Sequence, residues 1–214
     1  MTAGIQTALR LTEAGAIVLE SATDELCELD SVAGDGDHGL AMGAAAKAIR
    51  RRLAEDPPAD APTLTELLAT EFGAVGGSMG ALLSVAFEAL RDKTAACDAP
   101  LSARHVADYL GTVCEALSEF GGAKVGDKTI IDAAASAQEA AAAAADRGAG
   151  PAEALTAAAA GANAGADSTA NMIAQVGRAS RLGERSRGSV DAGARSFALV
   201  LTAVARTYAT GGRA

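Results

Sequence analysis

Apolar residues recur at three- and four-residue steps through most of the chain, the pattern of helices that bury one face. Ile5, Leu9, Ala16, Leu19 and Leu26 share such a face and predict one long helix over residues 5–26. Further helices are expected over residues 39–53, after a cap at Thr63, over 81–90, after a cap at Ser102, over 128–146, from Pro151 onward, and along the apolar series from Phe197 to Tyr208.

No segment alternates as a half-buried strand does. Aromatic residues make up only 3% of the sequence and Trp is absent, so Ala, Leu and Val must build the core, which favours closely packed helices. Glycine-rich breaks at residues 33–39, 73–80, 121–126, 161–166 and 183–193 separate the expected helices. With no proline-rich linker, residues 1–214 are predicted to form a single all-α domain of about eight helices.

The chain is acidic, with a formal net charge of −9, which argues against nonspecific binding to nucleic acid or to an anionic membrane. Its three cysteines, Cys27, Cys97 and Cys114, are widely spaced and are expected to be reduced thiols. The N-terminal residues lack the pattern of a signal peptide, and the alanine-rich stretch 133–145 is too short and polar to span a bilayer. We therefore expect a cytoplasmic protein without nucleic-acid or membrane partners.

The most informative segment is the acidic, glycine-containing stretch 29–39. Asp30, Asp35 and Asp37 fall within it, and Gly34 and Gly36 allow the sharp bends that would bring them together. Two like charges at ~4 Å repel by about 4 kcal/mol at an effective dielectric near 20, a cost that a divalent cation removes. Mg²⁺ prefers oxygen ligands and shares its shell with substrate phosphates, so we predict a metal–nucleotide site. The alternative is that Asp37 caps a helix and the other acids are solvated.

Three familiar ligand-binding motifs resemble parts of the sequence but do not match it. Gly34, Gly36 and Gly39 spell a dinucleotide-binding pattern, but a helix rather than a strand is expected before them. A calcium loop would need Glu where Ala46 stands. A phosphate-binding loop over 121–129 would need Lys directly after Gly126, and again a preceding strand.

Two other loops are candidates for contacts with phosphate. Residues 76–80 place consecutive glycines before a helix, which suits an anion, although a tight turn is the alternative. Residues 177–188 are basic and glycine-punctuated, and are expected either to contact phosphate as a mobile lid or to be a solvated loop. His38 is a functional candidate because it follows Asp37, whereas His105 sits in an ordinary helical pattern.

Four segments together carry a family resemblance. They are Gly-Asp-Gly-Asp-His-Gly within 29–39, Gly-Gly-Ser-Met-Gly at 76–80, Gly-Asp-Lys-Thr-Ile-Ile-Asp at 126–132, and Gly-Ala-Asp-Ser-Thr at 165–169 leading into Arg178 and Asp191. In these segments the chain resembles the nucleotide-binding (DhaL-type) subunit of dihydroxyacetone kinases. The resemblance implies an antiparallel eight-helix barrel with the nucleotide site at one end.

The resemblance also implies roles for individual residues. Asp30, Asp35 and Asp37 would ligate two Mg²⁺ ions that bridge the phosphates of ADP or ATP. The implied nucleotide contacts are His38, Gly39, Leu40, Ala41, Ser78, Met79, Gly80, Gly121, Gly122, Ile130, Arg178, Asp191, Ala192 and Gly193. No catalytic residue is implied. The chain departs from the family pattern at Met79, Arg181, Ser189 and Ala192, which puts the donor, the partner surface or the sugar in question more than the metal chemistry.

The implied function is the magnesium–nucleotide half of a short-chain ketose kinase. A separate ketose-binding (DhaK-type) subunit would hold dihydroxyacetone, erythrulose or another short ketose. The donor would be free ATP or a phosphocarrier (DhaM-type) subunit that rephosphorylates bound ADP, and a homodimer is left open. The alternatives are the nucleotide domain of another kinase, such as a fatty-acid kinase, and a nucleotide-sensing regulatory adaptor.

Overall fold

The computed structural model describes residues 1–95 and 100–211, so Cys97 lies outside the described residues. Within those ranges the chain is helical and has no strand, which confirms the predicted all-α fold. The helices are α1 (Ala3–Ser21), α2 (Thr23–Ser31), α3 (His38–Glu55), α4 (Ala61–Ala74), α5 (Gly77–Ala95), α6 (Ala103–Gly121), α7 (Ile130–Asp146), α8 (Pro151–Ser168), the 3₁₀ helices η1 (Thr169–Asn171) and η2 (Arg178–Ser186), and α9 (Ala192–Gly211).

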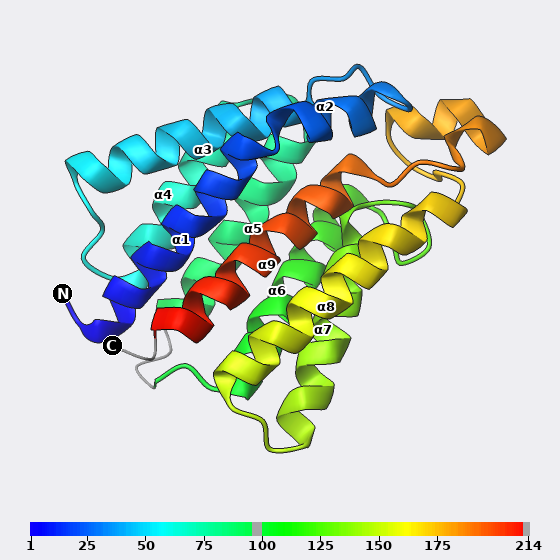
Figure 1. Ribbon diagram of the computed structural model, residues 1–214. Helices are drawn as coiled ribbons and strands as arrows, with labels where there is room; N and C mark the ends of the chain where they lie inside the picture. The colour runs from blue at the N-terminus through cyan, green and yellow to red at the C-terminus, as the bar shows by residue number, and fades with distance from the viewer. Residues whose placement is uncertain (96–99, 212–214) are drawn as a thin grey trace.

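The long helices lie side by side in one elongated bundle (Figure 1). The start of α1 and the end of α9 lie at one end of the bundle, and α2, η2 and the α6–α7 loop lie at the other (Figure 1). Helix α9 runs through the middle and packs against α1, α7 and α8. None of the described helices combines the length and hydropathy that a bilayer-spanning segment needs.

Alanine builds much of the core, as the composition predicted. Ala133, Ala137 and Ala141 of α7 are fully buried against α8, together with Ala158 and Ala162 of that helix. Small side chains leave little volume to fill, so the two helix axes approach closely and dispersion contacts extend along the whole interface. Larger residues, including Leu26, Met42 and Phe72, fill a second cluster in the half of the bundle that contains α1, α3 and α4.

Several expected helix boundaries were wrong, among them both ends of the helix expected over 81–90, since α5 spans Gly77–Ala95. Residues 5–26 are not one helix, because the chain leaves helical geometry at Ala22 (φ −94°, ψ 8°) and restarts as α2. The cap of α4 is Asp60 rather than Thr63, since the Asp60 carboxylate accepts the Thr63 N–H at 2.8 Å. Helix α7 begins at Ile130, after Lys128 has adopted a left-handed conformation (φ 63°) and Thr129 has capped the helix.

A further error concerns residues 161–166, where glycine was expected to end a helix. Helix α8 runs through them without interruption. A Cβ at Gly161 would lie 2.4 Å from the Ser136 carbonyl oxygen, and one at Gly165 would lie 2.5 Å from that of Asp132. These two glycines therefore allow α7 and α8 to touch, which periodicity within a single helix does not reveal.

Candidate functional site

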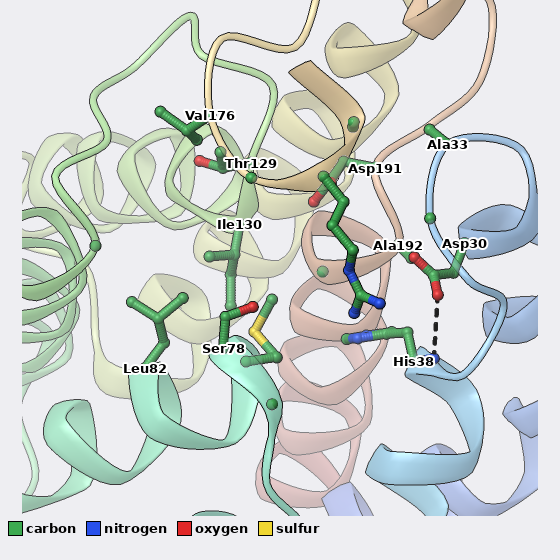
Figure 2. A pocket seen from close by; sticks show the side chains of 18 of the residues that line it. Asp30, Ala33, His38, Ser78, Leu82, Thr129, Ile130, Val176, Asp191 and Ala192 are labelled. Carbon is green, nitrogen blue, oxygen red and sulfur yellow. Dashed lines mark hydrogen bonds between the residues drawn. The ribbon is translucent and has the colours of Figure 1, made fainter. Parts of the chain in front are cut away.

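A cavity of about 480 Å³ opens at the end of the bundle where α2 and η2 lie. The first turns of four helices reach it: His38 of α3, Ser78 of α5, Ile130 of α7 and Ala192 of α9 all line it (Figure 2). A helix N-terminus carries partial positive charge and backbone N–H groups without helical partners, so this wall favours an anionic ligand.

The two sides of the cavity differ in polarity. Figure 2 shows Leu82, Ile130 and Val176 on one side, and Asp30 and His38 on the opposite side. An apolar wall across from a polar wall suits a ligand with a flat, weakly polar end and a highly charged end.

The acidic stretch brings its three carboxylates together. Asp30, Asp35 and Asp37 each offer an oxygen, and these oxygens all lie within 4.8 Å of one another. The bend depends on Gly34, where a Cβ would lie 2.1 Å from Asp30 Oδ1, and on Gly36, which has φ +77°. A cluster of carboxylate oxygens is the donor set that Mg²⁺ prefers, so these residues fit the predicted metal.

Asp30 also organises the loop itself. Its Oδ2 accepts the backbone N–H of Asp37 at 3.0 Å and that of His38 at 3.3 Å, the latter bond being drawn in Figure 2. The Asp37 side chain makes no capping hydrogen bond to α3. Asp37 therefore occupies the N-cap position of α3, as the alternative supposed, but it does not cap the helix through its side chain, and Asp30 accepts the Asp37 and His38 N–H groups instead.

Arg178, from η2, reaches across the opening of the cavity to the acidic cluster. Its Nη1 forms an ion pair with Asp35, and its Nη2 lies 4.0 Å from Asp37 Oδ1. Of the basic stretch, Gly177, Arg178 and Ala179 line the cavity, whereas the rest of η2, which is kinked at Gly183, does not. The Arg178 guanidinium offers several donors for phosphate oxygens in a fixed plane.

His38 is buried beneath the acidic loop. Its Nε2 lies 3.1 Å from Ser196 Oγ, and Ser196 donates its hydroxyl proton to the Gly193 carbonyl at 2.9 Å. Both contacts are satisfied together by the tautomer that carries the imidazole proton on Nε2, with the Ser196 oxygen accepting from His38. Burial lowers the pKa of His38, and the nearby charge of Asp30 only partly opposes this. His38 is consequently neutral at pH 7 and links the start of α3 to the start of α9.

Asp191 stands at the entry to α9. Its Oδ1 accepts the Ala194 N–H at 2.8 Å, as a helix cap does. Removal from water raises the pKa of Asp191 to about 6, with smaller contributions from the negative charges of Asp132 and Asp30, while the Ala194 hydrogen bond and Lys128 act in the opposite direction.

Most of the residues implied by the resemblance lie around the cavity. Those that line it are Asp30, Asp37, His38, Ala41, Ser78, Met79, Gly121, Ile130, Arg178, Asp191, Ala192 and Gly193. Asp35 stands at the rim with the acidic cluster. Met79 is one of the residues that depart from the family pattern. Its side chain packs close to α9, since a Cβ at Gly193 would lie 2.6 Å from Met79 Cε.

Four implied contact residues do not line the cavity. A Cβ at Gly39 would lie 2.0 Å from the Thr23 carbonyl oxygen, so this glycine lets α3 pack on α2. Gly80 packs similarly beside Phe72 of α4, with a Cβ distance of 2.7 Å to its carbonyl oxygen. Gly122 ends α6 in a left-handed conformation (φ 64°), and Leu40 is largely exposed.

Several lining residues were missed from the sequence. They include Lys128, Thr129, Leu82 and Val176. Lys128 and Thr129 belong to the 126–132 motif, but the resemblance implied no ligand contact for either of them. Leu82 and Val176 carry no signal beyond being apolar, because their place in the cavity depends on which helices become neighbours.

Comparison with known proteins identifies the family of the chain. Residues 32–206 match the DAK2 domain. The chain is 38% identical over 200 residues to the L-erythrulose kinase of Pectobacterium atrosepticum, covering 92% of this chain and 34% of that protein. It is 33% identical over 202 residues to the ADP-binding subunit DhaL of a PEP-dependent dihydroxyacetone kinase from Listeria innocua, covering 91% of this chain and 90% of that protein.

Among solved structures, the dihydroxyacetone kinase of C. freundii in complex with AMP-PNP and Mg²⁺ superimposes with a TM-score of 0.72 at 30% identity. That match covers 92% of this chain and 33% of the solved chain. The chain thus spans about a third of the length of the erythrulose kinase and of the C. freundii enzyme, and nearly all of the Listeria subunit. It belongs to the DAK2-domain family and, within it, to the DhaL type that its motifs indicated.

Proposed function

We propose that residues 1–214 act as one domain that binds a magnesium nucleotide in the described cavity and delivers its phosphoryl group to a short-chain ketose held on a separate subunit. One observation carries the proposal: three carboxylates converge at a cavity into which four helices point their N-termini. The carboxylates fit the cation, and the helix starts fit the polyphosphate.

The names of similar proteins support this assignment. The Listeria relative is named as an ADP-binding subunit, and the C. freundii relative was solved with AMP-PNP and Mg²⁺. Both belong to dihydroxyacetone kinases, while the Pectobacterium relative is named for L-erythrulose. All of them act on short ketoses by name, so a ketose is the acceptor that we propose.

We assign some residues of the cavity to the phosphate end of the nucleotide and others to its base. Asp30, Asp35 and Asp37 would hold Mg²⁺, which when bound neutralises charge on the phosphoryl group being transferred. Arg178 would donate to phosphate oxygens, and Leu82, Ile130 and Val176 would cover the base. The protein would act by alignment and electrostatics rather than through a covalent intermediate.

The test is reconstitution. The purified chain is mixed with ATP, Mg²⁺ and dihydroxyacetone or erythrulose, with and without a ketose-binding (DhaK-type) subunit, and the ketose phosphate is measured by mass spectrometry. We expect product only when both proteins are present. Product formed by this chain alone would contradict the division of labour, and nucleotide binding without transfer to any ketose would favour the adaptor or another kinase class.

The phosphoryl donor is tested separately. Nucleotide lost during gel filtration would indicate that ATP exchanges as a substrate, whereas ADP that stays bound would favour a phosphocarrier (DhaM-type) partner. A cytoplasmic location and a homodimeric state stay predictions, which cell fractionation and light scattering would check.

A further inference from the structure

Lys128 is a buried lysine in the wall of the cavity. Only 4% of its surface is exposed, and it lines the cavity next to Thr129 and Ile130. It is the one non-glycine residue with positive φ within residues 1–95 and 100–211. Lysine is rarely buried without partners and rarely adopts this backbone conformation, so the position costs free energy that its contacts must offset.

The Lys128 ammonium joins two segments that are distant in sequence. Its Nζ donates to the Thr169 carbonyl at 2.7 Å, at the end of α8, and to the carbonyl of Ser189, which precedes α9. The Thr169 hydroxyl extends the link, because it accepts the Asp191 N–H at 2.9 Å. Residues 189–191, which line the cavity, are thereby held at both ends: the Ser189 carbonyl binds Lys128, and the Asp191 N–H binds Thr169.

The charge of Lys128 also acts on the carboxylates around it. Burial lowers the pKa of Lys128, while Asp191 and Asp132 raise it. Asp132 is already engaged, since its oxygens accept the Gly126 and Thr129 N–H groups at 2.6 and 2.7 Å. Asp191, by contrast, belongs to residues 189–191, so its position depends on the contacts that Lys128 and Thr169 make with that segment. It also caps the start of α9, which faces the cavity.

We propose that Lys128 is a positioning residue for nucleotide binding: its ammonium ties residues 189–191 to the end of α8 and so holds Asp191 and the start of α9 in the cavity wall. This inference rests on the proposed function, because it takes the cavity to be a nucleotide site. Lys128 acts through the backbone carbonyls and Asp191, so no contact with the nucleotide is required of it.

The test compares four variants. Lys128→Met removes the ammonium and keeps most of the aliphatic stem. Lys128→Asn also removes it, with a side chain that tolerates positive φ and so relieves backbone strain. Lys128→Arg keeps a positive charge and donors. The matched control is Lys124→Met, in the same loop, where the lysine is exposed and does not line the cavity.

Two readouts are taken: the affinity for Mg·ADP by calorimetry, and amide hydrogen exchange of the ligand-free proteins. For Lys128→Met and Lys128→Asn we expect affinity to fall by about 10- to 100-fold, the usual cost of losing a group that orients a binding residue. Exchange should accelerate at Gly188 and Asp191, whose N–H groups bond to Ala170 and Thr169. Lys128→Arg should recover part of both effects, and Lys124→Met should match the unmodified chain.

The outcomes separate this inference from the proposed function. If the unmodified chain fails to bind Mg·ADP, the proposed function fails, yet hydrogen exchange still tests the tether. If the unmodified chain binds and both ammonium-free variants keep its affinity and exchange pattern, the positioning role is overturned. It is also overturned if both variants unfold, or if exchange accelerates equally throughout the bundle, because Lys128 would then support the whole fold rather than this wall.

Discussion

At the scale of single residues, the acidic cluster has two kinds of member. Asp30 is half-buried and accepts the Asp37 and His38 N–H groups, so it shapes the loop and also offers an oxygen to a cation. Asp35 and Asp37 are exposed, and their side chains make no hydrogen bond to the loop backbone. Substituting Asp35 or Asp37 therefore tests metal binding with less damage to the loop than substituting Asp30.

We expect Asp35→Asn and Asp37→Asn each to weaken Mg·ADP binding by about 100-fold or more, since one charge at ~4 Å contributes about 4 kcal/mol at an effective dielectric near 20. Calorimetry at fixed Mg²⁺ concentration measures the loss. Asp108→Asn is the control, because Asp108 is exposed on α6 and does not line the cavity. Affinities within twofold of the unmodified chain for all three variants would refute the assignment of the metal site.

Asp191 gives a prediction about pH. Because desolvation raises the pKa of Asp191 to about 6 from the ordinary aspartate value of 3.8, the unfolded chain releases this proton at lower pH than the folded chain does. The contribution of Asp191 to stability is therefore greatest at acid pH and declines as pH rises from about 4 through 6. Asparagine keeps the cap to Ala194 and removes the titration.

In ligand-free protein, Asp191→Asn should accordingly gain stability relative to the unmodified chain as pH rises, by about 2 kcal/mol between pH 4.5 and 7.5. Urea unfolding at pH 4.5 and 7.5 measures the difference between the two proteins. The same comparison with Asp108→Asn should show no such trend. A difference for Asp191→Asn that is flat between these pH values would contradict the raised pKa.

At the scale of elements, the interface between α7 and α8 depends on where side chains are absent. Gly161 and Gly165 lie four residues apart, so they face the same neighbour, and both approach carbonyl oxygens of α7. Asp132, whose carbonyl lies beside Gly165, also forms the capping box of α7 with Thr129. Packing of these two helices therefore helps to place the Lys128–Ile130 wall of the cavity.

Gly161→Ala or Gly165→Ala should destabilise the protein by about 1–3 kcal/mol, because a new methyl group forces the two helices apart. Gly111→Ala in α6 is the matched control: its nearest neighbour would lie 4.0 Å away, and alanine there should stabilise by about 0.5–1 kcal/mol through helix propensity. Denaturant unfolding distinguishes the signs. Stabilisation in all three variants would show that α7 and α8 are not in such close contact.

At the scale of the whole molecule, the cavity is formed by segments that are far apart in the sequence. The acidic loop joins α2 to α3, the wall with Lys128 precedes α7, and Arg178 arrives from η2. A ligand that touches all three would couple segments far apart in sequence. Binding should therefore stabilise the fold as a unit rather than one loop.

Mg·ADP at 100 times its dissociation constant should add about 2.7 kcal/mol of stability. For a chain of this size that corresponds to a rise in Tm of about 5–10 °C. Differential scanning calorimetry measures it, with ADP plus EDTA and Mg²⁺ alone as controls that should give smaller shifts. An equal rise for Asp35→Asn would show that the stabilising ligand does not use the acidic cluster.

Local chemistry along the chain was sufficient to predict the helical fold, the Ser102 and Pro151 helix starts, and the acidic loop as the metal-binding candidate. These features depend on residues close in sequence: periodic apolar positions, a capping hydroxyl, and three acids separated by glycines that can bend. Short-range sterics and charge decide such features, so they can be read without knowing which helices become neighbours.

The contacts between different elements were decided by the tertiary structure alone. It showed that Gly161 and Gly165 are helix contacts and not breaks, that Asp30 accepts the Asp37 and His38 N–H groups, and that Lys128 bridges Thr169 and Ser189. Each of these facts joins residues from different elements, through a distance or a hydrogen bond that exists only after packing. The amino-acid sequence thus determined the helices and the candidate ligands by local physics, whereas long-range packing decided which side chains meet to form the cavity.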